Sequence, residues 1–513
     1  MKTGRFALSL FLLLCITATA DDLVLKDGRF IEGVKIEKTT GGYNVLYKNG
    51  VVFVPERLVK DCILEGADGF VPRNDKEREM IEKGLVPFKG RWVTRKRRAS
   101  GLAKSRAKAK AKLDELKKHR EWVNRYVRKE RNFRFEYTID PEIFDNLGDL
   151  MEAYYKYFTK FWKIRKPSGL GPLRVCFYHD YDAFLQVGGA NRGVMGYYRH
   201  SPIDRLELNF FYDRIDPEYT IEVMFHETNH YLTHLIDINF SYPHNIGEAM
   251  AEYYGASKWD AIGKKMVVGG LLEGRLTEVM TDIQGGEFKK LEDFLGNKLE
   301  YADYTWGWTF VHFMMSTKKY EKKFKKYFLD LAKSKSVKRE FTGSRGTVSG
   351  KEMIRYFKKR MGIKDLAKLE AEWYAHIQQN MKLTSHRGYE KAARAALSTG
   401  QRVRARRFFR MAIEKGSTNP GTYLRYADTL TGSDSTEKAI GLIKRAIELD
   451  PFDATAYSKL GRFMRPTDKK ESDRLYALAI EIDPNNIDIL RDEALMKLLE
   501  ETQPTEPKPK NDD

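Results

Sequence analysis

The feature that most constrains this chain is a His-Glu-Thr-Asn-His run at residues 226–230. Residues four apart lie on the same face of a helix, so the two imidazoles can bind one metal ion when this segment is helical. Asp216 and Pro217 precede the run, and these residue types are typical of a helix start. Glu227 lies beside the first imidazole, where its carboxylate could take a proton from a water on the metal. The run therefore predicts a helix that carries a metal site.

A second predicted helix begins near residue 247 and supplies carboxylates to the same site. Glu248 follows His230 by 18 residues and can return to the metal as a third ligand beside His226 and His230. Glu252, one turn further, could accept a hydrogen bond from a ligand imidazole and fix its tautomer. Carboxylates four apart on a helix are usually only solvated, but these two stand in a small and apolar stretch. Two imidazoles and one carboxylate suit zinc, so we expect one Zn²⁺ ion.

These residues resemble the zinc site of the gluzincins, metallopeptidases whose third ligand is a glutamate from a second helix. Residues 247–253 look like that group's Glu-Gly-x-Ala-Glu-Tyr signature, with Ala249 in place of the usual glycine. The extended metzincin pattern would require glycine at position 233 and histidine at position 236, where this chain has Thr233 and Ile236. Residues 131–380, with the segments around them, are similar to an uncharacterised, exported, peptidase-MA-like bacterial family with C-terminal tetratricopeptide repeats.

The resemblance implies hydrolysis of peptide bonds, in which zinc activates a water and Glu227 acts as general base. Gluzincins commonly stabilise the oxyanion with a tyrosine downstream of the third ligand; Tyr304 is the candidate here, with Tyr301 as the alternative. Either tyrosine could instead be core packing. His234 and His244 lie near the ligands in sequence and could contact substrate, although a single histidine is more often structural.

Two other classes of function stay open on the sequence. The first is a non-catalytic zinc-binding interaction protein or scaffold, because a fold does not guarantee activity and the flanking modules look suited to binding. Against it, an inert descendant would have no need of Glu227, which is not a ligand. The second is a tether to anionic polymers through the basic segment at 95–130. That segment has few aromatic residues among its charges, so we do not expect nucleic acid as a partner.

Residues 1–20 have the pattern of a signal peptide, because Lys2 and Arg5 precede a short apolar run and Ala18-Thr19-Ala20 suits a signal peptidase. The apolar run is shorter than the roughly 20 residues needed to span a bilayer, and no later segment qualifies. We therefore expect export to the periplasm, the medium or the cell surface, with no transmembrane segment after cleavage. Removing Lys2 and Arg5 lowers the formal net charge from +19 to +17 (89 basic minus 72 acidic residues), which favours acidic partners.

Turn signals and composition predict a multidomain α+β protein. Glycine-containing turns between short β-prone runs predict a small SH3-like β-barrel at residues 21–66. Residues 67–94 should be a connector, and residues 95–130 a basic helical linker with little apolar face. Cys62 and Cys176 show no metal-ligand spacing; we expect two separate buried thiols, although the sequence does not decide whether they pair.

Residues 131–380 are expected to form the gluzincin-type α+β domain. A helix should start at Asp140-Pro141, and strand-like runs follow at 173–178, 194–198 and 206–211. The last of these precedes the motif helix and is the candidate edge strand, to which an extended peptide substrate could add itself.

Beyond residue 385 an internal repeat appears, with Ala-Ile-Glu recurring at Ala412, Ala446 and Ala479, spacings of 34 and 33. This period is typical of the tetratricopeptide repeat (TPR), a pair of helices that buries its faces only by stacking on its neighbours. We therefore expect an all-α TPR-like solenoid at residues 385–500, able to bind a protein partner. The tail at 501–513 is rich in Pro, Lys and acids and should be disordered.

Overall fold

The computed structural model describes residues 21–63, 74–200, 206–260, 262–296, 302–334, 350–430, 433–486 and 489. The chain divides into two units, one formed by residues 1–115 with 473–513 and the other by residues 116–472. The predicted signal peptide, the predicted disordered tail and Tyr301 lie outside the described residues.

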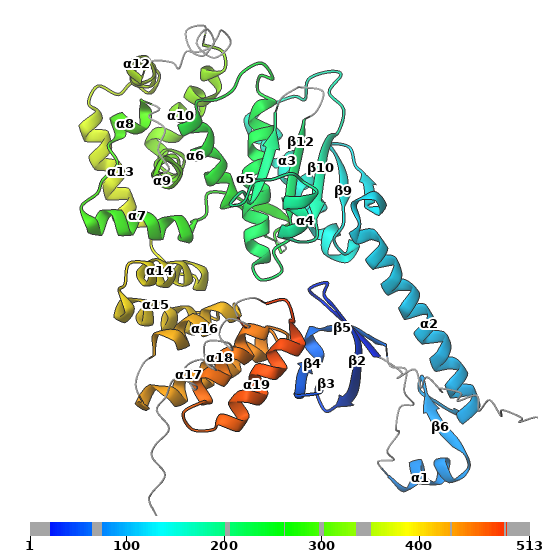
Figure 1. Ribbon diagram of the computed structural model, residues 1–513. Helices are drawn as coiled ribbons and strands as arrows, with labels where there is room; N and C mark the ends of the chain where they lie inside the picture. Colours follow the sequence, from blue (N-terminus) through cyan, green and yellow to red (C-terminus); the bar gives the residue numbers. More distant parts are fainter. Residues whose placement is uncertain are drawn as a thin grey trace, which may run out of the picture. The chain divides into compact units, whose positions relative to one another are not determined.

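The N-terminal β module is a five-stranded antiparallel sheet (Figure 1). Its strands are β1 (Asp21–Leu25), β2 (Phe30–Thr39), β3 (Gly42–Tyr47), β4 (Gly50–Pro55) and β5 (Val59–Ile63), in the order β4-β3-β2-β1-β5. Gly28 and Gly41 form turns with φ of 87° and 81°, a left-handed conformation that favours glycine. Val45, Val52 and Leu23 are fully buried and form the inner face of the sheet.

The predicted closed barrel is not found, because the described strands leave the sheet open. Strand β4 pairs only with β3, and β5 pairs only with β1, among the described residues. Pro55 ends β4, and a 3-10 turn, η1 (Glu56–Leu58), then carries the chain to the opposite edge. A proline has no N–H to donate across a closing strand pair, so this end of β4 is suited to an edge. Cys62, in β5, forms no disulfide among the described residues and is only half-buried.

The connector and the basic segment consist of local elements. Helix α1 (Asp75–Glu82) is capped by Asn74 and is followed by a hairpin of β6 (Leu85–Phe88) and β7 (Arg91–Thr94). The basic helix α2 (Arg95–Arg120) has one buried side chain, Leu113, which joins the apolar cluster of Val24 and Ile63. The rest of this helix is solvated, as its composition predicted.

Helix α2 is shorter than we predicted, because residues 121–129 belong to the α/β domain. Residues Trp122–Asn124 form a 3-10 turn, η2, and Tyr126–Lys129 form strand β8. Trp122 stacks on Tyr178 with 4.7 Å between ring centroids, and Tyr126 stacks on Tyr137 at 5.3 Å. These aromatic partners lie far along the chain, so the helical charge pattern gave no sign of where the helix ends.

A second sheet lies at the centre of the α/β domain (Figure 1). Its order is β11-β12-β10-β9-β8, with β8, β9 (Phe133–Tyr137), β10 (Leu173–Tyr178), β11 (Gly196–Arg199) and β12 (Glu207–Phe211). Strands β9, β10 and β12 are parallel, and β8 and β11 pair antiparallel at the two edges. The prediction that residues 206–211 form an edge strand is therefore wrong. Strand β12 lies inside the sheet with all five residues buried, and β11 lies at the edge.

Helices α3 (Pro141–Trp162) and α5 (Pro217–His234) pack against each other beside this sheet. Both start as predicted, with Asp140 or Asp216 accepting a backbone hydrogen bond and proline in the first turn. Met151, Tyr154 and Phe158 of α3 are fully buried. Helix α4 (Tyr181–Gln186) covers β10 and β12, and Cys176 is a buried free thiol in β10.

The remainder of this domain is mostly helical. It comprises α6 (His244–Gly255), a hairpin of β13 (Lys258–Asp260) and β14 (Lys265–Val267), α7 (Glu273–Gly285), α8 (Leu291–Leu295), α9 (Ala302–Ser316), α10 (Lys318–Leu331), α12 (Gly350–Met361) and α13 (Leu366–Asn380). Helix α9 lies at the centre of this group, and its Trp306, Trp308 and Phe310 are buried. No helix among the described residues is long and apolar enough to cross a membrane.

The C-terminal helices form TPR-like pairs. Two pairs are α14 (His386–Ser398) with α15 (Arg402–Glu414) and α16 (Pro420–Thr429) with α17 (Ser433–Leu449), and α18 (Ala454–Met464), which packs on α17, and α19 (Lys469–Ile482) follow along the chain. The repeated alanines Ala412, Ala446 and Ala479 lie on α15, α17 and α19 and are fully buried. Their recurrence therefore marks the positions where only a small side chain fits between stacked helices.

Candidate metal centre

Two neighbouring helices carry the predicted site residues. His226, Glu227 and His230 lie on α5, and Glu248 and Glu252 lie on α6. The helices approach closely at Gly255, where a Cβ would lie 3.3 Å from the carbonyl oxygen of Glu222 and 3.8 Å from Cβ of His226. A larger residue there would push the two helices, and hence the ligands, apart.

The three predicted ligands converge on one point. The His226 Nε2 and His230 Nε2 atoms are 3.3 Å apart, and Glu248 Oε2 lies 3.2 Å from the first and 3.5 Å from the second. Ligands held about 2.1 Å from a tetrahedral zinc ion stand about 3.4 Å from one another. His226, His230 and Glu248 also form the candidate metal cluster among the described residues. The donor types and their triangle therefore fit zinc.

Glu227 lies beside this triangle without belonging to it. Its Oε1 atom is 4.0 Å from His226 Nε2, and its side chain is 15% exposed. Edge strand β11 lies against it, since a Cβ on Gly196 would come 3.3 Å from Glu227 Cγ. The carboxylate is therefore close to the metal position and still free to act on a water molecule there.

Glu252 lies next to the imidazole of His226, on the side away from the other two ligands. Its Oε1 atom lies 3.7 Å from His226 Nδ1, on the opposite side of the ring from Nε2. Arg275 of α7 holds the same carboxylate with Nη2 2.7 Å from Oε1 and Nε 3.3 Å from Oε2. Glu252 thus lies next to the His226 imidazole, as predicted, and Arg275 fixes the orientation of the Glu252 carboxylate. Sequence reasoning missed Arg275. No signal in the sequence points to it, because Arg275 lies 23 residues from Glu252.

Tyr304 lies at the same site, while its alternative, Tyr301, lies outside the described residues. The Tyr304 ring packs edge-on against His244, with 5.5 Å between centroids, and the Arg275 guanidinium lies 5.8 Å from the ring centroid. Burial, followed by the charges of Glu248 and Glu227, raises the pKa of Tyr304 to about 12. The phenol therefore stays protonated near neutral pH and can donate a hydrogen bond.

The two additional histidines have different surroundings. His234 is held structurally, since Nδ1 lies 2.9 Å from the Tyr198 hydroxyl and Nε2 lies 2.7 Å from the Ile238 carbonyl oxygen. His244 Nδ1 lies 3.6 Å from Glu248 Oε1, and its side chain is 40% exposed. Only His244 therefore combines solvent access with contact to a predicted ligand.

The charges around the centre favour a cation. Burial opposes protonation of His226, but interaction with Glu248 and the charges of Glu227 and Glu252 raise its pKa above the usual value. Burial also opposes ionisation of Glu248, but the charge of His230 and contacts with both imidazoles hold the pKa of this carboxyl well below its usual range. Three carboxylates next to two imidazoles leave a negative surplus that a divalent cation would neutralise.

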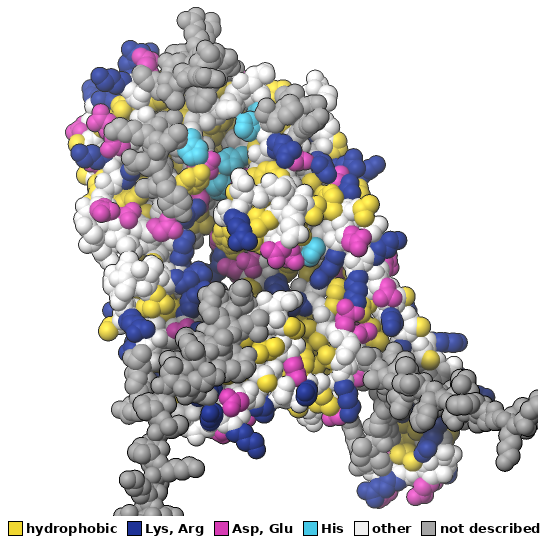
Figure 2. All heavy atoms as spheres, in the orientation of Figure 1, with side chains coloured by type: hydrophobic (Ala, Val, Ile, Leu, Met, Phe, Trp, Pro, Cys, Tyr) yellow, Lys and Arg dark blue, Asp and Glu magenta, His cyan; other side chains and the backbone are white. Residues whose placement is uncertain are grey.

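The centre opens into a cleft of about 1770 Å³. Figure 2 shows histidine and acidic side chains gathered on this face of the molecule. The cleft is lined by the predicted site residues, by residues Gly193–Tyr198 around β11, and by residues of the first repeat helix, α14. The first TPR-like helix thus contributes a wall of the cleft.

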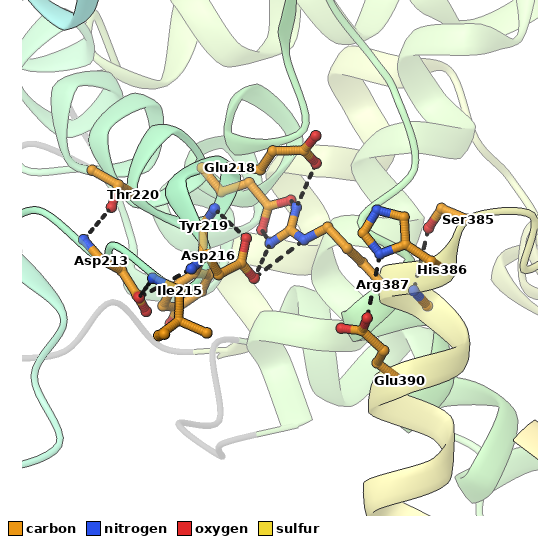
Figure 3. Close-up of polar contacts among 12 residues, drawn as sticks. Asp213, Ile215, Asp216, Glu218, Tyr219, Thr220, Ser385, His386, Arg387 and Glu390 are labelled. Atoms are coloured by element: carbon orange, nitrogen blue, oxygen red, sulfur yellow. Dashed lines mark hydrogen bonds and ion pairs between the residues drawn. The ribbon is translucent and has the colours of Figure 1, made fainter. Parts of the chain in front are cut away.

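Arg387 fixes this wall to the motif helix (Figure 3). From α14, it donates hydrogen bonds to Asp216 at 3.1 and 3.3 Å, and to both carboxylate oxygens of Glu222. Glu222 lies one turn before His226 on α5. Sequence reasoning missed Arg387, since its partners lie 165 and 171 residues away and no local pattern connects them.

Comparisons with known proteins assign this chain to no family. No protein-family model matches it, and no curated protein sequence matches it significantly. Among solved structures, it is similar to one described as "YrrB: a TPR protein with an unusual peptide-binding site", with 10% identity over 43% of this chain and 97% of that chain and a TM-score of 0.23. That score is too low to support an argument about function, so the gluzincin resemblance stays a prediction carried by its residues.

Proposed function

We propose that this chain is an exported zinc metallopeptidase. The observation that carries the proposal is the triangle of His226 Nε2, His230 Nε2 and Glu248 Oε2, with edges of 3.2 to 3.5 Å and Glu227 beside it. A structural zinc site is usually closed by four protein ligands, whereas three ligands with an open fourth position are typical of catalytic zinc. The centre faces a cleft, where substrate can reach that position.

The protein groups around the centre have separable roles. When bound, zinc supplies Lewis acidity that polarises a carbonyl and acidifies a water. Glu227 then takes the proton as the water attacks and delivers one to the leaving amine. Tyr304, protonated and close to the carboxylates, donates a hydrogen bond to the developing oxyanion. Glu252 and Arg275 hold the ring of His226 in its ligand orientation.

The cleft is suited to a polypeptide rather than to a small molecule. Its volume of about 1770 Å³ exceeds the roughly 300–1,000 Å³ of ordinary small-molecule sites. Strand β11 lies at the sheet edge and lines the cleft, so an extended peptide could pair with its main chain next to Glu227.

Metal content is the first test of the proposal. Purified wild-type protein should hold about one zinc ion per chain, and His230→Ala should lose it, because only two of the three ligands remain. The matched control is His376→Ala, since His376 Nε2 and His312 Nδ1 form another histidine contact at 3.0 Å, away from the centre. Cleavage of a denatured protein should disappear with a chelator and return with zinc. Zinc retained in His230→Ala and lost in His376→Ala would place the metal elsewhere and overturn the proposal.

Gly196→Ala should reduce kcat/KM by about tenfold or more while zinc content stays at the wild-type level. The new Cβ would lie 2.7 Å from Val223 Cγ1 and 3.3 Å from Glu227 Cγ, so the general base would have to shift. The control is Gly247→Ala beside Glu248, where the nearest atom would be 3.6 Å from the new Cβ. Both substitutions add one methyl group next to a site residue. Equal rates for the two variants would show that contact with β11 does not position Glu227.

One observation favours a second candidate, a zinc-binding interaction protein that does not hydrolyse its ligand. The cleft includes residues of α14, as a peptide-binding surface of the repeats would. The two candidates differ in Glu227, since a scaffold needs the ligands but not the base. A protein that binds zinc and peptides but cleaves no peptide, or whose cleavage resists a chelator and is equal in wild type and Glu227→Gln, would support the scaffold.

A further inference from the structure

The hairpin of β13 and β14 carries three large apolar side chains that are exposed to solvent. Trp259 is 40% exposed, Ile262 is 97% exposed and Val267 is 46% exposed. Eleven large hydrophobic side chains are exposed among the described residues, and three of them lie within residues 258–267. Apolar side chains that are exposed singly need no explanation, whereas a group of them marks a candidate contact surface.

An ordered turn presents Ile262 at the tip of this hairpin. Asp260 Oδ1 accepts hydrogen bonds from the backbone N–H groups of Ile262, at 3.1 Å, and of Gly263, at 2.9 Å. A Cβ on Gly263 would collide with Asp260 Oδ2, and Lys264 has a left-handed φ of 48°. At the base of the hairpin, Met266 is buried in the domain core. Turns usually carry polar residues, so the turn itself does not require an isoleucine that points outward.

Basic side chains surround this apolar group. Lys258, Lys264 and Lys265 are exposed, and Asp260 is the hairpin's one acid, so the hairpin has a net charge of +2 (three lysines minus one aspartate). Lys258 pairs across the hairpin with Val267, and Lys265 pairs with Asp260. Side chains alternate between the two faces of a strand, so Lys258, Lys265 and Val267 share the face that is turned away from the domain core.

We propose that the tip of the β13–β14 hairpin binds the surface of an anionic phospholipid bilayer. Ile262 enters the boundary between head groups and acyl chains, and the lysine ammonium groups contact lipid phosphates. Tryptophan is enriched at this depth of a bilayer, which suits Trp259 beside the tip. A polypeptide bound in the cleft fits the tip less well, because Ile262, Lys264 and Lys265 do not line the cleft.

The lipid contact would place the cleft close to the bilayer. Lys258 and Trp259, at the start of the hairpin, line the cleft that contains the metal centre. Polypeptide segments at the membrane surface would then be the substrates nearest to the zinc ligands. This consequence rests on the proposed peptidase function, whereas lipid binding by the hairpin does not.

An environment-sensitive fluorophore on the tip tests the contact directly. Ile262→Cys is introduced into the full-length protein together with Cys15→Ser and Cys62→Ser, and nitrobenzoxadiazole is attached to the thiol at position 262. Cys176 is 1% exposed and should not react. The matched control carries the fluorophore at Val403→Cys, a position on α15 that is 81% exposed. This control gives the signal of an exposed position when another segment, such as the basic helix α2, holds the vesicle.

Vesicles of phosphatidylcholine with about 30% phosphatidylglycerol should brighten the fluorophore at Ile262→Cys by about twofold or more and shift its emission to the blue. The fluorophore at Val403→Cys should not respond, and pure phosphatidylcholine vesicles should change neither signal. No brightening at position 262, or equal brightening at both positions, would overturn the proposal. An equal response to the two kinds of vesicle would overturn the assignment to anionic lipid.

The lysines are tested in the same labelled protein. Lys264→Gln with Lys265→Gln should weaken the response at position 262, because two charges that attract the anionic surface are lost. Lys322→Gln with Lys323→Gln removes the same charge from exposed positions of α10 and should leave the response unchanged. Equal responses from the two double variants would contradict a role for the hairpin lysines. Brightening at position 262 in a protein that cleaves no peptide would refute the peptidase function and leave the lipid contact standing.

Discussion

Glu227→Gln should keep one zinc ion per chain and lose peptide hydrolysis by about 10²–10⁴-fold, the usual contribution of a general base. Glutamine has the same shape but cannot accept the proton of the attacking water. The three ligands are untouched, because Glu227 Oε1 lies 4.0 Å from His226 Nε2 and outside their triangle. The change should therefore appear in kcat, with little effect on the affinity for zinc or peptide.

Single-turnover cleavage of a fluorogenic peptide, beside metal analysis of the same sample, measures both properties. Glu218→Gln is the matched control, since Glu218 lies on the same helix with its side chain 63% exposed and contacts Arg387 only at 3.5 Å. It should retain activity within about twofold. Cleavage that resists a chelator and has the same rate in wild type and Glu227→Gln would rule out the peptidase mechanism. It would favour the zinc-binding interaction protein that does not hydrolyse its ligand.

Arg387→Met should lower the free energy of unfolding by about 2–4 kcal/mol, because it leaves two partly buried acids without their partner. The Arg387 side chain is 20% exposed, and those of Glu222 and Asp216 are 30% and 33% exposed. We therefore expect less than the full cost of an entirely buried pair. Methionine keeps much of the side-chain volume, so the effect should come from the lost charge rather than from a cavity.

The loss of stability in Arg387→Met should depend on pH, because it arises from the ionised carboxylates of Glu222 and Asp216. Burial raises the pKa of Glu222 and of Asp216, and Arg387 counteracts this in the wild type. Without Arg387, both pKa values should rise further. An acid whose pKa is higher in the folded state stabilises the fold below its unfolded pKa, and this contribution is lost as pH rises through the folded value. The free energy of unfolding that Arg387→Met loses relative to the wild type should therefore be smaller at pH 5 than at pH 8.

Urea unfolding at the two pH values provides the measurement, with Arg355→Met as the matched control. Arg355 pairs with Glu352 at 2.5 Å on the surface of α12, with its side chain 75% exposed. Such an exposed pair contributes at most about 1 kcal/mol. A deficit for Arg387→Met no larger than that of the control, or one that grows at low pH, would contradict the assigned role of the Arg387 contacts.

Local signals in the sequence determined the centre of the site and the broad division of the chain. The start of α5 follows from Asp216 and Pro217, because a cap and a first-turn proline act within one helical turn. His226 and His230 share a helix face for a similar reason, since helix geometry alone sets the direction of residues four apart. The repeat period predicted stacked TPR-like helices, and Ala412, one of the repeated alanines, is fully buried.

The tertiary structure alone decided which side chains support this centre and what encloses it. Arg275 reaches Glu252 and Arg387 reaches Glu222 only after α7 and α14 have packed near α5 and α6. Strand β12 was predicted to be an edge strand, yet β11 pairs along its outer side and buries it. The open N-terminal sheet and the early end of α2 also depend on partners distant in sequence. Helix periodicity and capping act over a few residues, whereas ion pairs and strand neighbours depend on the packing of the whole chain, and a single sequence does not display that packing.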